Sequence, residues 1–256
     1  MPLAAPQMSS TWPLRAYAAR SPRSLETLVN SDESALAAGD FSAWLTAMRR
    51  ALTGEAEAGA DVPCGGCTGC CTSSQFVLVE PDETGARAHI PAELLFPAPR
   101  LPTGHLLLGY DENGHCPMLV DGACSIYEHR PRTCRTYDCR VFPAAGVELD
   151  ATDDADKAVI AERTQRWRFT HPTARDRVEH EAVRAAARFV HERSDELPAD
   201  VVPVTATQRA VLAVRLHEAF LAPDATTGDP VVVPDPDPEA VRVTIATRRG
   251  GDPGGR

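Results

Sequence analysis

The sequence predicts an α+β fold, in which a small cysteine-rich module with short strands is flanked and covered by α-helices. All eight cysteines lie between Cys64 and Cys139, and none occurs in the first 63 or the last 117 residues of the 256-residue chain. Glycine and proline recur through this stretch and disfavour long elements within it. On both sides of it, apolar residues recur at the three- and four-residue spacing of amphipathic helices.

The N-terminal part is predicted to contain a tail and two helices. Residues 1–22 are expected to be disordered, and residues 23–60 are expected to form a helical segment. A first helix is predicted at about 24–37, and a second begins after Asp40, a favourable N-cap residue. One face of this second helix carries Phe41, Trp44, Leu45, Met48 and Leu52.

The cysteine-rich module is assigned to residues 61–145. Within it, residues 75–80 (QFVLVE) are rich in β-forming side chains and predict a short strand. Residues 81–90 (PDETGARAHI) predict a short helix with Pro81 in its first turn, where proline is well tolerated.

The second half of the module is predicted to contain a hairpin, in which residues 105–110 pair with residues 116–120 across the turn DENG. Asp121 and Gly122 predict a further turn. Short helical turns and loops are expected from Cys124 to Phe142, because the glycine and proline content leaves no room for long elements.

The C-terminal region is predicted to be helical over residues 150–222. Segments 153–169 and 173–194 have helical spacing and are separated by Pro172. Residues 223–256 are assigned to a Pro/Gly-rich linker, a short strand with the sequence AVRVTIAT, and a disordered tail. A third helix is predicted at about 207–221, with the core candidates Val211, Leu212, Leu216 and Phe220.

The charge and hydropathy of the chain indicate which partners and which compartment to expect. The formal net charge of −10 repels phosphate backbones, so no nucleic acid is expected as a partner. No window approaches the roughly 18 uninterrupted apolar residues of a membrane span, and residues 1–23 lack the apolar core of a secretion signal. We therefore expect a cytoplasmic protein without membrane contact, whose partner is an unidentified protein or small molecule.

The cysteine spacing is the most informative feature of the chain. It starts as Cys-x2-Cys-x2-Cys-Cys and, after a gap of 44 residues, continues as Cys-x7-Cys-x9-Cys-x4-Cys. A C-x2-C step allows a tight turn to direct two sulfurs at one centre, and glycines between the first cysteines leave amide N–H groups free to donate to thiolate. The candidate metal ligands are Cys64, Cys67, Cys70, Cys71, Cys116, Cys124, Cys134 and Cys139.

Three interpretations of this spacing compete. A disulfide framework is disfavoured by the reducing compartment and by the adjacent pair Cys70-Cys71, because vicinal disulfides are strained. Structural zinc in one or two four-thiolate sites is the second interpretation. The third is an iron–sulfur cluster of the 4Fe–4S type, which the C-x2-C-x2-C register favours.

Neighbouring side chains could share or complete the site. The side chains of Cys70 and Cys71 are expected to diverge, so that one serves a first centre and the other a second centre or acts as a reactive thiol. His115 and His129 could each replace a sulfur ligand, although eight cysteines already fill two sites, which favours ordinary surface histidines.

Arginines cluster around the last two cysteines, as Arg130, Arg132, Arg135 and Arg140. Guanidinium groups stabilise negative charge on a thiolate-rich centre and bind carboxylate or phosphate in a bidentate manner. Of these, Arg130 and Arg135 are the candidates for cofactor binding. Tyr127 and Tyr137 are expected to pack over the site.

This combination of motifs resembles the YkgJ-type CxxCxxCC cysteine-cluster family, a zinc- or iron-chelating domain. The resemblance covers about residues 62–143, and its pattern is the CxxCxxCC start, a later Cys-Pro, and Cys-x-x-Tyr-x-x-Arg-Pro-x-x-Cys before a last cysteine. The matching positions are Cys64, Cys67, Cys70, Cys71, Cys116, Pro117, Cys124, Tyr127, Arg130, Pro131, Cys134, Tyr137 and Cys139.

The residues and the resemblance together predict a metal-binding protein, and three functions stay open. The first is an iron–sulfur protein with a redox role, as the oxidoreductase label often given to the family implies. The second is a zinc-stabilised interaction module without catalysis. The third, implied by a related cysteine pattern in flagellin lysine methylases, is a protein-modifying enzyme; no catalytic residue is identified from the sequence.

Overall fold

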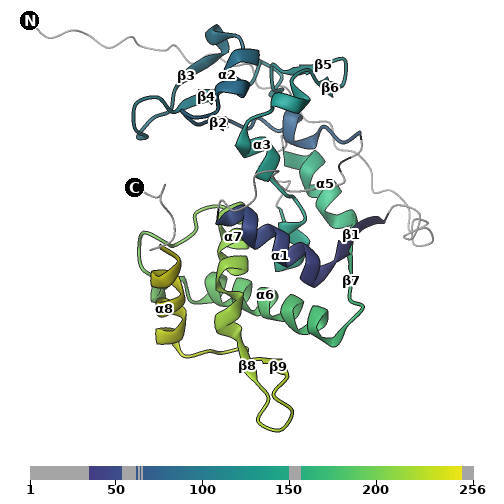
Figure 1. The fold of residues 1–256 in the computed structure, drawn as a ribbon, viewed down its shortest axis with the longest axis vertical. Coiled ribbons are helices and arrows are strands. Elements are labelled where there is room, and N and C mark those ends of the chain that lie inside the picture. Colours follow the sequence, from purple (N-terminus) through teal and green to yellow (C-terminus); the bar gives the residue numbers. More distant parts are fainter. Residues whose placement is uncertain (1–34, 54–61, 63, 65, 150–156, 250–256) are drawn as a thin grey trace, which may run out of the picture. The chain divides into compact units, whose positions relative to one another are not determined.

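The computed structural model describes residues 35–53, 62, 64, 66–149 and 157–249 (Figure 1). These residues form helices and short strands, which confirms the predicted α+β class. The predicted tails and the greater part of the first predicted helix lie outside the described residues. No helix in the described ranges combines the length and the apolar character needed to cross a membrane.

The elements are short in the middle of the chain and longer toward its C-terminus. The α-helices are α1 (Phe41–Leu52), α2 (Thr84–His89), α3 (Arg132–Thr136), α4 (Val141–Ala145), α5 (Ala158–Arg166), α6 (Ala174–Glu192), α7 (Ala206–Leu216) and α8 (Pro238–Arg249). The 3-10 helices are η1 (Gly69–Thr72), η2 (Ala92–Leu94), η3 (Tyr127–His129), η5 (Ser194–Glu196) and η6 (His217–Phe220). The strands are β1 (Leu36–Asp40), β2 (Val77–Val79), β3 (Leu95–Pro97), β4 (Leu106–Leu108), β5 (Leu119–Val120), β6 (Ala123–Cys124), β7 (Trp167–Thr170), β8 (Leu221–Pro223) and β9 (Pro230–Val232).

The strands of the described residues form four small sheets. Strand β4 lies between β2 and β3 in an antiparallel sheet, and β5 pairs with β6. The predicted hairpin between residues 105–110 and 116–120 is therefore wrong. The predicted turn at Asp121 and Gly122 is confirmed, and it explains the difference: φ angles of 50° and 76° suit a two-residue hairpin turn, so β5 folds onto β6 instead.

The main hydrophobic core is built by α1, α4, α6 and α7, which contact one another. The amphipathic pattern of α1 is confirmed, because Phe41, Trp44, Leu45 and Met48 are all buried. Helix α6 lies alongside α7 below α1 in Figure 1 and contributes a row of buried alanines that allows close packing. Cys139 belongs to this core, with only 8% of its surface exposed.

A second, smaller core lies under the sheet of β2, β3 and β4. Among the described residues it buries seven apolar side chains, and Cys116 and Cys124 pack against it as partly buried neighbours. The two cores therefore each contain cysteines. The seven buried residues are Val77, Val79, Ala86, Ile90, Leu108, Met118 and Ile126.

Three predictions of element type are wrong. The end of the first predicted helix, residues 36–37, lies in β1, and the end of the predicted segment 153–169, residues 167–169, lies in β7; the two strands pair in parallel. The predicted strand AVRVTIAT lies in helix α8. Its β-branched residues are tolerated there because Val241 and Ile245, one turn apart, are both buried in the main core.

Candidate metal centre

The CxxCxxCC loop is shaped by backbone hydrogen bonds that turn successive cysteines in different directions. The amide of Cys67 donates to the carbonyl of Cys64 at 3.1 Å, and the amide of Cys71 donates to the carbonyl of Thr68 at 2.8 Å. Cys70 and Cys71 lie in the 3-10 helix η1. With three residues per turn, adjacent side chains point about 120° apart, so the two thiols diverge.

Four cysteines form a first group, here called the first quartet: Cys64, Cys67, Cys70 and Cys139. Burial raises the pKa of Cys70, and the neighbouring thiols raise it further, with Cys139 the largest contributor. Burial also raises the pKa of Cys139 to about 11, and Cys64 and Cys67 contribute in the same direction. Burial and then Cys67 raise the pKa of Cys64. Electrostatic effects link these four thiols to one another, and the adjacent Cys71 also raises the pKa of Cys70, more than Cys67 does.

Residues of α5 and β7 contact the first quartet and the loop that carries it. The indole N–H of Trp167 donates to Sγ of Cys139 at 3.2 Å, and this bond acts to lower the pKa of that thiol. Nη2 of Arg163 donates to the carbonyl oxygen of Cys64 at 3.0 Å. Gly69 packs against the same helix, because a Cβ placed on it would lie 3.4 Å from Val159.

A buried ion pair follows directly on Cys139 and fixes its loop to the helical core. Nη2 of Arg140 lies 2.8 Å from Oδ2 of Asp138, and the side chain of Asp138 is only 2% exposed. The indole N–H of Trp44 donates to the same carboxylate oxygen at 2.8 Å, and Nη1 of Arg140 donates to the carbonyl of Ala38 at 3.0 Å. The position of Cys139 is therefore determined by α1 and β1 as well as by its own loop.

The other four cysteines form the second quartet: Cys71, Cys116, Cys124 and Cys134. Burial raises the pKa of Cys71 to about 11, and Cys116 and Cys124 are the next contributors. Burial raises the pKa of Cys134 to about 12, followed by Cys116, Cys71 and Cys124. For Cys116 burial again dominates, opposed by backbone hydrogen bonding from Met118 and Leu119. Weaker effects of Cys64 and Cys67 on Cys71 mark the place where the two quartets meet.

A pair of backbone hydrogen bonds fastens two members of the second quartet together. The amide of Cys116 donates to the carbonyl of Cys71 at 2.7 Å, and the amide of Ser74 donates to the carbonyl of Gly114 at 2.9 Å. Gly114 has a φ of 77°, and a Cβ on it would fall 2.3 Å from Oγ of Ser74. Only glycine fits this close approach without displacing the serine.

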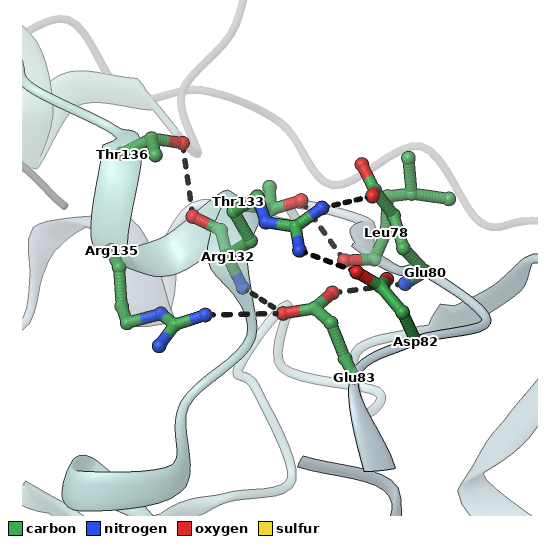
Figure 2. Close-up of polar contacts among 8 residues, drawn as sticks. All are labelled: Leu78, Glu80, Asp82, Glu83, Arg132, Thr133, Arg135 and Thr136. Atoms are coloured by element: carbon green, nitrogen blue, oxygen red, sulfur yellow. Dashed lines mark hydrogen bonds and ion pairs between the residues drawn. The ribbon is translucent and has the colours of Figure 1, made fainter. Parts of the chain in front are cut away.

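Cys134 lies on α3, which is held against the small sheet by the contacts drawn in Figure 2. Nη2 of Arg132 lies 2.8 Å from Asp82, its Nη1 pairs with Glu80, and its amide donates to Glu83. The hydroxyl of Thr133 donates to the carbonyl of Leu78 in β2 at 2.9 Å. The acidic turn after β2 therefore positions Cys134.

The two quartets border a cavity of about 340 Å³. Seven of the eight cysteines line it, and the exception is Cys139, which lies in the main core. Solvent reaches Cys64, Cys70 and Cys134 from the cavity, although surrounding protein atoms still disfavour their thiolate forms. The cavity wall also contains apolar side chains such as Met118 and Ile126. The cysteines thus share a partly enclosed, largely apolar space.

The donor set fits a thiophilic metal. All eight cysteines are free thiols. Within the described residues, no three His, Cys, Asp or Glu side chains already stand at metal-binding separation, so an ion would have to draw the thiols inward as it binds. Burial first, and the neighbouring thiols second, raise the pKa of Cys70 and Cys134, so a bound cation would favour their thiolate forms.

The structure places the other predicted residues in different settings. Arg130 and Arg135 line the cavity; Arg130 stacks 3.9 Å over the ring of Tyr127, and Arg135 approaches Glu83 at 3.6 Å. Tyr137 also lines the cavity, and its pKa is raised by burial and then by Cys70 and Cys139.

The predicted histidines lie elsewhere. His115 is not part of the cavity wall, and its amide donates to Oδ1 of Asp111 at 2.8 Å. His129 is exposed and stacks on His89, with ring centroids 3.7 Å apart. Neither histidine contacts the cavity, in keeping with the interpretation as ordinary surface residues.

Sequence reasoning missed Trp167 and Arg163. Both lie beyond the last cysteine, and nothing in their spacing marks them as neighbours of thiols. Their guanidinium and indole groups are stacked, with Cζ of Arg163 4.9 Å from the centroid of the Trp167 ring. The sequence signal that could have identified them was a tryptophan at the end of a predicted helix rich in polar residues.

Comparison with known proteins supports metal binding by the cysteine-rich region. Residues 63–165 match the CxxCxxCC family, described as a putative zinc- or iron-chelating domain. The CxxCxxCC match includes all eight cysteines and also α5, whose Arg163 contacts Cys64. It supports metal binding by this CxxCxxCC domain, while the YkgJ subtype stays a prediction. No curated protein and no solved structure matches the chain.

Proposed function

We propose that this chain binds an iron–sulfur cluster of the 4Fe–4S type through the first quartet and uses it in electron transfer. The observation that carries the proposal is that three cysteines of the CxxCxxCC loop lie together with a fourth cysteine from far along the chain. Cys64, Cys67 and Cys70 stand in the C-x2-C-x2-C register that holds three corners of a cubane, and the fourth thiol, Cys139, comes from far along the chain.

The chain's own groups around the first quartet suit this role. The cluster supplies one-electron chemistry when bound. The indole N–H of Trp167 donates to Sγ of Cys139 and stabilises negative charge on that sulfur. Arg163 lowers the pKa of Cys64 and acts in the same sense. Arg130 and Arg135 lie in the cavity wall beside the second quartet, where Arg130 lowers the pKa of Cys134, and are proposed to balance thiolate charge from that side.

Access to the first quartet is through the cavity. The exposed thiols of Cys64 and Cys70 border it, so an unidentified protein or small-molecule partner could approach the cluster from this side. Burial of Cys139 excludes water from the opposite side. Cysteines at metal-binding spacing suit a reducing compartment, so we propose a cytoplasmic location.

The test is anaerobic purification of the full chain without a tag, followed by an absorption spectrum and assays of iron, sulfide and zinc on the same sample. A broad band at about 400 nm, with about four irons and four sulfides per chain, is the expected result. The substitution Cys64→Ser should abolish the band. A colourless protein that contains zinc and no iron would overturn the proposal.

A further inference from the structure

We propose that the outer face of the small sheet is a docking surface for a protein partner that presents apolar side chains within a rim of lysine and arginine. The outer face comprises Phe76, Leu78, Phe96, Leu107 and Tyr110. Docking on this face requires no bound metal, and only a role of the partner in electron transfer rests on the proposed function.

The sheet of β2, β3 and β4 is apolar on both sides. The buried residues Val77, Val79 and Leu108 face the small core. Leu78 and Leu107, which pair with each other, alternate with them and point to the opposite side, and among the described residues neither belongs to a core. An antiparallel sheet with one side in water normally carries polar side chains on that side. The apolar residues here therefore indicate a surface that a partner covers.

Three aromatic rings stand on or beside this side of the sheet. Phe96 pairs with Leu107 and so points the same way, and Phe76, Phe96 and Tyr110 are 54%, 39% and 41% exposed. The ring centroids of Phe76 and Phe96 are 6.0 Å apart, and those of Phe76 and Tyr110 are 5.0 Å apart. The two phenylalanine rings lie over Gly109, where a Cβ would be 3.4 Å from Phe96. Rings that restrain one another in this way lose little conformational entropy when a partner covers them, which suits anchors of an interface.

The position of the aromatic rings favours a protein over a small molecule. In the described part of the chain, the residues that line the cavity include Phe76 but neither Phe96 nor Tyr110. Small-molecule sites are concave, whereas an apolar face outside a cavity is typical of protein interfaces. Because Phe76 belongs to both, a partner on the outer face would lie at the border of the cavity.

The edges of the sheet do not offer strand addition as an alternative. The two edge strands are β2 and β3. The hydroxyl of Thr133 on α3 donates to the carbonyl of Leu78 in β2 at 2.9 Å. In β3 the amide of Leu95 donates to the carbonyl of Ala92, and Pro97 has no amide N–H. Since an added strand needs main-chain donors and acceptors, we expect contact through the side chains of the outer face.

The charges around the outer face indicate which partner fits. Glu93 precedes β3 in η2, and Asp111 and Glu112 lie shortly after β4; all three are exposed. The ion pairs seen among the described residues use other carboxylates. Residues 91–115 contain no lysine and one arginine, Arg100. A second copy would bring like charges together, and nucleic acid or an anionic membrane would also be repelled, so the rim of the partner is cationic.

The experiment measures binding of a fluorescein-labelled peptide of alternating lysine and leucine to the full chain, purified without oxygen. The same peptide with glutamate in place of lysine should not bind. Phe96→Ser should weaken binding of the basic peptide at least about tenfold. The matched control is Val204→Ser, which removes an apolar side chain that is 85% exposed outside the sheet and should leave binding unchanged.

A second pair of variants keeps the test valid if Phe96→Ser misfolds. Glu93→Gln combined with Glu112→Gln should weaken binding about three- to tenfold and reduce its dependence on salt. Glu162→Gln combined with Glu192→Gln changes the net charge equally, at exposed positions of α5 and α6, and should have no such effect. In the wild-type protein, the bound peptide should slow amide hydrogen exchange in β2, β3 and β4 and leave α6 unchanged.

The outcomes separate this proposal from the proposed function. Phe96→Ser should keep wild-type iron, sulfide and visible band, because Phe96 is not part of the cavity wall. Colourless wild-type protein that binds the basic peptide would refute the cluster and support the docking surface. Equal affinity for the two peptides, or equal affinity of wild type and Phe96→Ser, would overturn the docking surface whatever the metal. So would a wild-type dimer that dissociates in Phe96→Ser, because it assigns the outer face to a second copy.

Discussion

Replacing Arg140 with methionine should destabilise the protein by about 3–5 kcal/mol, because it leaves a buried carboxylate without its cation. The side chains of Asp138 and Arg140 are 2% and 11% exposed. Methionine removes the bonds from Nε and Nη2 of Arg140 to Asp138, at 2.8–3.1 Å, and the bond from Nη1 to the carbonyl of Ala38. The indole N–H of Trp44 remains and cannot neutralise the charge. Since each 1.4 kcal/mol is about tenfold, the folding equilibrium should fall at least roughly a hundredfold.

Urea unfolding followed by tryptophan fluorescence measures this loss. The matched control is Arg188→Met, which breaks an exposed pair with Glu181 at 2.8 Å and should cost less than about 1 kcal/mol. The double variant with Asp138→Asn and Arg140→Met should recover part of the stability, because it removes the uncompensated charge. A cost below about 1 kcal/mol for Arg140→Met alone would refute the reasoning.

Three further predictions concern the two quartets and the helical core. Trp167→Phe removes the N–H donor to Cys139. The midpoint potential of the cluster proposed at the first quartet should fall by roughly 40 mV, which corresponds to about 1 kcal/mol for the lost hydrogen bond. A redox titration measures this shift. Burial lowers the pKa of His180 to about 4. The free energy of unfolding should therefore be highest above pH 6.5 and fall by at most about 3 kcal/mol between pH 6.5 and 4, where the unfolded chain binds the proton more tightly. His180→Phe should flatten this pH profile in unfolding experiments. Gly114→Ala forces a contact with Ser74 and should speed the loss of the bound metal to a chelator.

Each of these predictions has a matched control or a contrary result. Gly122→Ala shares the strained backbone, with a φ of 76°, but meets nothing within 4 Å, so its bound metal should be lost more slowly than in Gly114→Ala. An unchanged potential in Trp167→Phe would show that the indole does not tune the centre. An unaltered pH profile in His180→Phe would assign the acid sensitivity to other groups.

The long elements and the α+β class could be predicted because their signals are local. Helix α1 follows from its apolar spacing after Asp40, and the turn at Gly122 follows from its dipeptide. The parallel pairing of β1 with β7 could not be predicted, since its partners are about 130 residues apart and neither segment alternates clearly. Helix α8 was missed because burial of Val241 and Ile245 overrides their preference for strands.

The eight cysteines could be named from spacing, but their division into quartets required the fold. Divergence of Cys70 and Cys71 was expected from adjacency alone, whereas the grouping of Cys139 with the early cysteines depends on Asp138, Trp44 and the helical core. The arginines were predicted from composition as a set around the site. Their individual settings depend on acidic residues such as Glu83, whose position is fixed only by the turn after β2.

The adjacent pair Cys70-Cys71 joins the two quartets through a single peptide bond. The described residues of the CxxCxxCC loop include no strand, and Cys64 and Cys70 are exposed, so apolar packing contributes little to the loop's rigidity. Metals in both quartets would tie this loop to the helical core through Cys139 and to the small sheet through Cys116. Metal binding at both quartets would then restrain the loop at two points. Removal of both metals should increase the mobility of the loop by more than the sum of the increases caused by each single removal, because either metal alone still restrains the shared helix η1.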